Sequence, residues 1–219
     1  MMMFEETIKR TALGLMSIDM NRNLLMETSP EKLDGFRDAY DNCIGCNRLY
    51  LYDHFGSTAI DNVLSRARYM SSALDVRWLF VDHLSILASG VAEGDERRLI
   101  DNAMTAIKTL AMETGMGIIL VSHLRRPEKK GHEEGATTSL SQLRGSHAIA
   151  QLSDIVVGLE RDQQSVTARD VTQMRVLKNR FTGETGIAGW LKYDRATGRL
   201  HEELSDPRGG HGDLQDPIF

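Results

Sequence analysis

Residues 78–83 read Trp-Leu-Phe-Val-Asp-His, and the fold class follows from them. Four consecutive apolar residues before a polar pair predict a short strand that is buried on both faces, as in a parallel sheet. An aspartate at the carboxyl edge of such a strand is typical of P-loop ATPases, where the carboxylate holds Mg²⁺, usually through water. The alternative for Asp82 is an acid that only caps a loop.

The same arrangement recurs at residues 117–123, Gly-Ile-Ile-Leu-Val-Ser-His. The apolar run predicts a strand over 117–122, and the apolar spacing before it predicts a helix over 95–114 that stops at Gly115. His123 would lie at the carboxyl edge of the sheet, where open α/β sheets bind ligands. A histidine there can donate a hydrogen bond to a γ-phosphate, although a loop histidine without a role remains the alternative.

The remaining elements extend this pattern in both directions along the chain. Alternating strands and helices followed by a run of strands predict an α/β fold, a parallel sheet with an antiparallel extension. We expect Ser29 to cap a helix that has Pro30 at its first position. From residue 202 the chain is rich in Gly, Pro and acidic residues, which predicts a disordered tail over 202–219. The expected helices are 5–26, 30–40 and 57–72, the expected strands are 48–52, 154–160 and 173–178, a turn is expected at 182–186, and an antiparallel pair at 189–193 and 199–201.

Composition excludes several classes of protein. The chain has 219 residues, 41% hydrophobic and 26% charged, which suits one sizeable globular domain. A net charge of −5 implies that any contact with nucleic acid is local. No apolar run spans a bilayer and no signal peptide is present, so we expect a cytoplasmic protein. Cys43 and Cys46 form a lone C-x-x-C, which we interpret as incidental reduced thiols because a zinc site needs four ligands.

Two basic regions suit phosphate groups. The first runs from Arg125 to His132 and resumes at Arg144-Gly145, and a flexible basic loop of this kind is typical of contacts with a nucleic-acid backbone. Nearby glutamates dilute its charge, so a solvated surface loop is the alternative. The second pairs Lys178 with Arg180; side chains two apart on a strand share a face and can meet one anion, as an arginine finger does. The alternative is a plain basic hairpin.

The N-terminus offers one more candidate and one absence. Met2-Met3-Phe4 is a short apolar run that ends in Glu5, and a glutamate at a strand end beside the Asp82 strand can polarise a water for hydrolysis. A frayed terminus is the alternative. The motif G-x-x-x-x-G-K-[ST] does not occur in the sequence, so the loop whose amides and lysine cradle a triphosphate is missing from it.

Taken in order, these motifs resemble one family. The segments LFVDHLSIL, LVSHLRRP, LRGSHAIAQLSD and LKNRFTGETGIAG are similar to the helicase domain of T7-type phage primase-helicases, with DnaB and Twinkle helicases as more distant relatives. The resemblance covers about residues 3–201, and it implies a RecA-like core over 1–201 that lacks its first strand and P-loop. The LRGS and RFTGETG segments favour a helicase over RecA-type recombinases and circadian-clock-type ATPases.

The resemblance implies roles for individual residues. Glu5 resembles the base that activates water, Asp82 the Walker B carboxylate that holds Mg²⁺ through water, and His123 the γ-phosphate sensor. Arg180, with Lys178 beside it, resembles a finger that acts on a neighbouring subunit, and Arg161 and Tyr193 resemble the pair that sandwiches the base. The residues expected to grip the DNA backbone are Arg125, Lys129, Lys130, Arg144 and Gly145.

The same resemblance implies substrates and partners. A family member is a hexameric or heptameric ring that hydrolyses ATP or dTTP with Mg²⁺, moves 5′ to 3′ on single-stranded DNA and unwinds the duplex. The acidic tail ending in Phe219 resembles one that docks on the replicative DNA polymerase, with a generic solubilising tail as the alternative. Without a P-loop, the chain is interpreted as a truncated gene product, a split helicase or a degenerate non-catalytic module that binds single-stranded DNA or a helicase ring. We also expect the missing strand and helix to leave one side of the sheet exposed.

Overall fold

The computed structural model describes residues 2–3, 8–52, 60–85, 93–125, 131–143 and 147–203. Its centre is a parallel sheet in the order β2-β1-β3-β4, which confirms the parallel sheet expected from the two apolar runs. Val81 pairs with Leu120, so the strands before Asp82 and His123 end side by side. The strands are β1 (Met2–Met3), β2 (Leu51–Tyr52), β3 (Trp78–Val81) and β4 (Gly117–Leu120).

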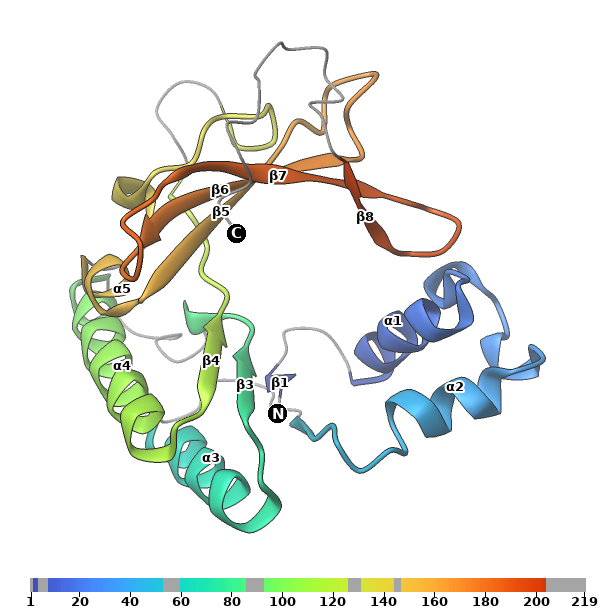
Figure 1. Cartoon of the computed structure of the whole chain (residues 1–219), viewed down its shortest axis with the longest axis horizontal. Coiled ribbons are helices and arrows are strands. Elements are labelled where there is room, and N and C mark those ends of the chain that lie inside the picture. Colours follow the sequence, from blue (N-terminus) through green and yellow to red (C-terminus); the bar gives the residue numbers. More distant parts are fainter. Residues whose placement is uncertain are drawn as a thin grey trace.

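Three helices cover the outer face of this sheet: α3 (Ile60–Leu74), α4 (Glu93–Thr114) and α5 (His147–Leu152) (Figure 1). Leu79 and Val81 point into this layer and are 1% and 3% exposed. Helix α4 ends at Gly115, whose φ of +69° is a backbone conformation that glycine adopts without strain. The main hydrophobic core therefore lies on one side of the parallel sheet. Its buried residues are Val63, Leu64, Ala67, Leu79, Val81, Leu84, Ile100, Ala103, Met104, Ile107, Leu110, Met116 and Ile149.

The C-terminal strands form a second, antiparallel sheet in the order β5-β6-β7-β8. Trp190 of this sheet is 1% exposed and packs with Ala168 and Val171. The expected hairpin is confirmed, because Tyr193 pairs with Leu200. Within the described residues no ladder joins β4 to β5, so the antiparallel strands form a sheet of their own instead of extending the parallel one. The strands are β5 (Ile155–Arg161), β6 (Val171–Asn179), β7 (Gly186–Tyr193) and β8 (Leu200–Glu203).

The N-terminal helices differ most from expectation. The helix predicted over 5–26 is α1 (Ile8–Met20), and it ends where Asn21 takes a φ of +51°. The helix predicted over 30–40 is split at Gly35, whose φ is +83°, into a 3₁₀ turn, η2 (Pro30–Lys32), and α2 (Phe36–Cys43). Ser29 is at the N-cap position of η2 and Pro30 at its first position, as expected, but the Ser29 side chain makes no capping hydrogen bond. Two further 3₁₀ turns are η1 (Leu24–Met26) and η4 (Leu140–Gln142).

Other boundaries moved by a few residues. The strand predicted over 48–52 pairs only at Leu51 and Tyr52, and β8 continues through Glu203, two residues into the predicted tail. Residues 204–219 lie outside the described residues, as do 57–59 at the start of the third predicted helix. Cys43 and Cys46 are free thiols near the end of α2. No helix in the described part of the chain is long and apolar enough to cross a membrane.

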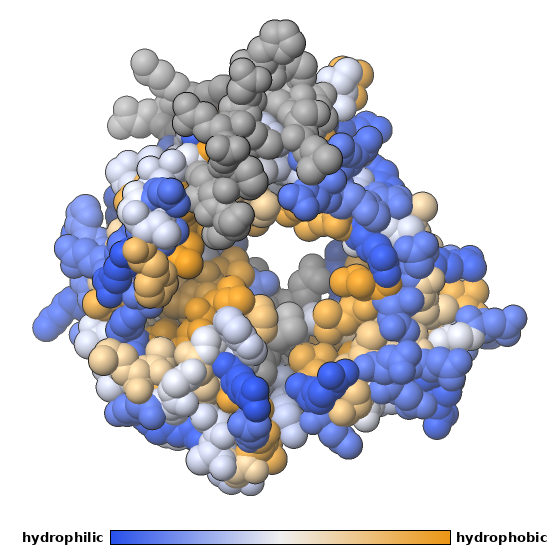
Figure 2. Space-filling view, viewed as in Figure 1, coloured by the Kyte–Doolittle hydropathy of each residue, from blue (hydrophilic) through white to orange (hydrophobic). Residues whose placement is uncertain are grey.

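The inner face of the parallel sheet is bare of helices in the described structure. Trp78 and Phe80, which alternate with Leu79 and Val81, are 57% and 39% exposed, and Ile119 on β4 is 43% exposed. Figure 2 shows an opening through the molecule with apolar residues on its walls, between the parallel strands, the antiparallel sheet and α1. A cavity of about 1020 Å³ adjoins this face between α1 and the start of β3, lined in part by Trp78 and Phe80.

Candidate functional site

The carboxyl edge of the parallel sheet gathers the predicted hydrolysis residues. Asp82 follows β3 directly and is exposed, and His123 follows β4 by three residues. Backbone hydrogen bonds join the segments that follow the two strands. Val121 N donates to Val81 O and Leu84 N donates to Val121 O, each at 2.9 Å. The ring of His83 stands edge-on to the ring of His123, with centroids 4.1 Å apart. Residues 82–84 and 121–123, which follow the two strands, therefore lie side by side, and we call this surface the platform.

Strand β1 places the N-terminus at the same edge. Met2 pairs with Phe80 and Met3 with Val81, so the chain leaves β1 beside the residue that precedes Asp82. Glu5 itself lies outside the described residues. The sequence left open whether the N-terminal apolar run is a strand or a frayed end. The backbone register shows that Met2 and Met3 form a strand of the sheet.

This edge fits a water-mediated magnesium ion. Mg²⁺ in nucleotide-hydrolysing proteins keeps several waters and takes one or two carboxylates together with substrate phosphates. Asp82 offers one exposed carboxylate at the edge, which is the donor that such an arrangement requires. No cluster of three or more histidine, cysteine or acidic side chains occurs within the described ranges, so a cage built from protein ligands alone is not formed there.

The predicted DNA loop begins directly after His123. Leu124 forms an antiparallel bridge with Leu143, and Arg125 N donates to Gln142 O at 2.7 Å. The start and the end of the loop are thus joined, and residue 144 follows the bridge immediately. Arg125 is exposed, whereas Lys129, Lys130, Arg144 and Gly145 lie outside the described residues.

Lys178 and Arg180 converge on the C-terminal end of α5. Lys178 Nζ donates to the carbonyls of Ala150, Gln151 and Ser153 at 2.7, 3.0 and 2.8 Å. Arg180 Nη2 donates to Gln151 O at 2.9 Å, and its Nη1 lies 3.1 Å from an Asp154 carboxylate oxygen. The two side chains meet as expected, and within this chain they meet the negative end of a helix. Burial lowers the pKa of the Lys178 ammonium, and the neighbouring Arg180 charge lowers it further.

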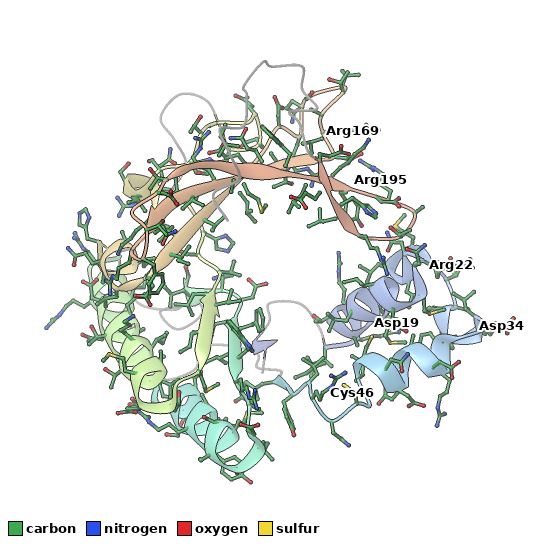
Figure 3. All side chains as sticks on the ribbon, viewed as in Figure 1. Asp19, Arg22, Asp34, Cys46, Arg169 and Arg195 are labelled. Carbon is green, nitrogen blue, oxygen red and sulfur yellow. The ribbon has the colours of Figure 1, made fainter. Side chains whose placement is uncertain are left out.

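Arg161 and Tyr193 meet at Asp170, at the other end of the antiparallel sheet. Arg161 Nη2 donates to Asp170 Oδ1 at 3.4 Å, and Tyr193 N donates to Asp170 O at 2.8 Å. Arg195 makes two hydrogen bonds to the same carboxylate, which hold the pKa of Asp170 below its usual range. Figure 3 shows Arg169 and Arg195 at this end of the sheet.

The pair Arg161 and Tyr193 lies far from the pair Lys178 and Arg180 within one chain. Arg161 pairs with Thr172 and Lys178 pairs with Val156, so six residues of β6 separate the two positions. At about 3.3 Å per residue the separation is roughly 20 Å. Among the described residues, the structure brings Asp82 and His123 to one edge and Arg161 and Tyr193 to one residue, Asp170, but it does not bring these groups and Arg180 into one pocket.

Sequence reasoning missed four polar residues that organise these regions. The ring of His83 packs on the ring of His123, and Asp154 forms ion pairs with both Lys108 and Arg180. Asp170 forms ion pairs with several arginines. Glu160 is the most buried of the acids in this group, at 7% exposed. An acid within β5, directly after the apolar run 155–159, was the available signal, because a buried charge needs partners.

Comparison with known proteins identifies the family. The chain matches the DnaB-like helicase C terminal domain over residues 1–201. It is 40% identical over 216 residues to the DNA helicase/primase of Enterobacteria phage T3, covering 96% of this chain and 38% of that protein. It is also 29% identical over 115 residues to the replicative DNA helicase DnaB of Leifsonia xyli, covering 52% of this chain and 24% of that protein.

Solved structures show the same fold. A DnaB-like replicative helicase superposes with a TM-score of 0.70 at 19% identity, covering 91% of this chain and 49% of that one. A second solved structure, an ATPase domain, superposes with a TM-score of 0.69 at 19% identity, covering 91% of this chain and 72% of that domain. The chain thus spans well under half of the phage T3 protein and about three quarters of the solved ATPase domain. Sequence and fold together show that the chain belongs to the DnaB-like helicase C-terminal domain family.

Proposed function

We propose that this chain is part of a replicative DNA helicase, a ring of hexamer or heptamer size that couples NTP hydrolysis to 5′-to-3′ movement on single-stranded DNA. The observation that carries the proposal is the direct succession of His123, the Leu124–Leu143 bridge and the basic stretches on either side of it. In this proposal, the residue that contacts a γ-phosphate is followed at once by the residues that contact DNA.

This succession gives a short path along which a change at the γ-phosphate would move the residues proposed to contact DNA. His123 leaves β4 at the platform formed with His83, and Leu124 is already bridged to Leu143. A shift of His123 on loss of a γ-phosphate would move both Arg125 and the chain leading to Arg144, because the bridge joins them. Asp82 would hold the magnesium ion, which neutralises charge that develops on the phosphates during hydrolysis. Glu5, two residues after β1 in the sequence, would take the proton from the attacking water.

Arg180 suits a role in a neighbouring subunit's site. It follows the end of β6, two residues beyond Lys178, whose position lies roughly 20 Å along the strand from the pair proposed to hold the base. In a head-to-tail ring each interface is heterologous, so one subunit can offer Arg161 and Tyr193 while the next offers Arg180. Lys178 would hold the end of α5 in place beside it, through its three carbonyl contacts.

The triphosphate cradle must come from a strand–loop–helix segment with G-x-x-x-x-G-K-[ST], which this sequence does not contain. We propose that this segment packs on the bare inner face at Trp78, Phe80 and Ile119, where apolar side chains are 39–57% exposed. The 72% coverage of the solved ATPase domain supports this, because about a quarter of that domain has no counterpart in this chain.

Two assays test the proposal. For the chain by itself we expect no turnover of ATP or dTTP, with or without oligothymidylate, and robust turnover would contradict the need for the added segment. In a protein that includes the strand–P-loop–helix segment, His123→Ala should keep basal hydrolysis but lose its stimulation by single-stranded DNA. Unchanged stimulation in an intact ring would show that His123 is not the coupling residue.

The alternative is a non-catalytic module that binds single-stranded DNA or a helicase ring. The retention of Asp82 and His123 on one platform favours the helicase, since DNA binding alone needs neither. We also propose that the tail ending in Phe219 docks on the replicative polymerase, on the strength of its acidic residues and terminal aromatic. Deleting residues 214–219 should weaken polymerase binding at low salt, and unchanged affinity would mark a solubilising tail.

A further inference from the structure

Glu160 is a buried carboxylate whose partners span two parts of the fold. Its Oε1 atom accepts hydrogen bonds from Thr138 N at 2.8 Å and Thr138 Oγ1 at 2.9 Å. Arg175 Nε lies 2.7 Å from the same oxygen, and Arg175 Nη2 and Gln173 Nε2 donate to the other oxygen at 3.3 and 2.8 Å. Arg175 and Gln173 belong to β6, whereas Thr138 belongs to the segment 131–143 that precedes α5.

Gly158 makes room for Thr138 on the same strand. A Cβ atom at Gly158 would lie 2.0 Å from Thr138 Oγ1 and 2.8 Å from Thr138 Cβ, which no packing tolerates. Thr138 is 3% exposed, so it sits in a fitted place on β5 and does not merely lie on the surface. Gly158 is two residues from Glu160, so both face the same side of the strand. Together, Gly158 and Glu160 form the place on β5 that accommodates the side chain of Thr138.

The segment held in this way lies between the two basic stretches. Its last residue, Leu143, forms the bridge with Leu124, and its first turn is tied to the chain just after β5, where Gln163 N donates to Glu133 O at 2.9 Å. Thr138 is the attachment in the middle. The start of one basic stretch at Arg125 and the start of the other at residue 144 therefore share a base that is fastened to the antiparallel sheet.

We propose that Glu160, with Gly158, is a positioning residue that anchors segment 131–143 through Thr138 and so holds the flanking basic stretches in place for DNA. The inference rests on the DNA contact in the proposed function. Its physical basis is the buried charge. Burial would raise the pKa of the Glu160 carboxyl, but the Arg175 guanidinium and the Thr138 donors together lower it, so the carboxylate stays ionised at neutral pH.

The test compares variants that break the anchor with a matched control. Glu160→Gln and Glu134→Gln remove the same charge, but Glu134 is exposed on the same segment, and the carboxylate that receives Thr138 is that of Glu160. Simple electrostatics predicts tighter DNA binding for both, because each removes a negative charge. The anchor predicts the opposite sign for Glu160→Gln, about fivefold weaker binding of a fluorescent 20-nucleotide oligothymidylate, since a charge-assisted bond is lost.

Two further variants leave the charge unchanged. Gly158→Ala should expel Thr138 and weaken DNA binding by about as much as Glu160→Gln, whereas Thr138→Ser, which keeps the hydroxyl, should bind as the native chain does. If Glu160→Gln does not fold, Gly158→Ala and Thr138→Val decide the question. Hydrogen exchange supplies a readout that needs no DNA: amides of 136–143 should exchange about tenfold faster, with those of β6 and β7 unchanged.

Each outcome is decisive. Unchanged exchange in Gly158→Ala and Glu160→Gln would overturn the anchor. Faster exchange with unchanged DNA affinity would show a structural bond without a positioning role, and would also overturn the proposal. Failure of the native chain to bind oligothymidylate would count against the proposed function, and the exchange measurement would then show separately whether Thr138 is held.

Discussion

The two faces of the parallel sheet differ in how far they are covered, and alternate residues of strand β3 show the difference. On β3, Leu79 and Val81 are 1% and 3% exposed beneath α3 and α4, while Trp78 and Phe80, which alternate with them, are 57% and 39% exposed. All four side chains are apolar. The strand therefore has the composition expected of a strand that is buried on both faces, but in the structure only one of its faces is buried.

The difference indicates where a further layer belongs. An apolar stripe on one face of a strand is stable only when another element covers it. The exposed residues continue across β4 and β5, where Ile119, Ile155 and Val157 are 43%, 45% and 48% exposed. Exposed apolar residues thus occur on both sheets, and a segment that covered them would join the two sheets.

Truncating the buried face should have the largest effect. Leu79→Ala removes a side chain that is 1% exposed, so it should lower the free energy of unfolding by about 3 kcal/mol. Phe80→Ala on the same strand should cost only about 1 kcal/mol, because no closed cavity forms on an exposed face. Urea unfolding followed by circular dichroism measures both. Equal losses would mean that the inner face is covered in solution, for example by self-association.

Acid should loosen the tie between the outer helices and the antiparallel sheet. Lys108 Nζ of α4 lies 2.7 Å from Asp154. That hydrogen bond lowers the pKa of the Asp154 carboxyl, and the Arg180 charge lowers it further. The stability it contributes is complete above the unfolded pKa of about 3.9 and is lost as pH falls through the lower folded pKa. Because Asp154 is 39% exposed, solvent screening limits the contribution to at most about 1 kcal/mol.

The measurement is thermal unfolding of the native chain and Asp154→Asn between pH 7 and pH 2.5. The variant should be less stable at neutral pH, and the difference should shrink toward the acid end. A constant difference across the range would show that the ion pair does not account for the loss.

Polar substitution on the inner face should change surface properties more than stability. Ile119→Ser should alter the free energy of unfolding by less than about 1 kcal/mol, since the side chain already has 43% of its surface in water. It should reduce binding of a hydrophobic dye and slow aggregation, because the apolar patch becomes smaller. Fluorescence titration and light scattering report these effects. Ile118→Ser, on the packed side, is the control and should destabilise strongly.

Gly117→Ala should have the smallest effect on stability and a clear optical one. Gly117 pairs with Trp78, and a Cβ there would lie 2.3 Å from the indole ring. The side chain of Trp78 is largely exposed and can turn aside, so the cost should stay near zero, while its emission should shift. The other tryptophan, Trp190, is 1% exposed and should keep its emission. An unshifted spectrum would show that Trp78 does not lie over Gly117.

Much of the fold could be predicted where local pattern and packing agree. The apolar runs before Asp82 and His123 indicated strands β3 and β4, and the helical spacing located α4 to within two residues at its start. The N-terminal helices were predicted too long, because the breaks at Asn21 and Gly35 depend on positive φ values that apolar spacing does not report. The strand over 48–52 shrank to two paired residues, since pairing needs a neighbour of matching length.

The candidate site divides in the same way. Asp82 and His123 could be placed at one edge because carboxyl ends of parallel strands coincide. Lys178 and Arg180 could be placed on one face, but the C-terminal carbonyls of α5 that receive them come from 25 to 29 residues earlier. Glu160 was missed because its partner Thr138 is 22 residues away in a loop whose path no periodicity describes.

The sequence alone determined the family, the parallel strands and which polar residues follow them, because motifs and hydrophobic periods are local properties of the chain. Tertiary structure alone decided that the antiparallel strands form a separate sheet, that one face of the parallel sheet is bare in the described structure, and that a buried carboxylate fastens the loop between two basic stretches. These features depend on contacts between residues distant in sequence, and such contacts are set by packing and by the pairing of buried polar groups.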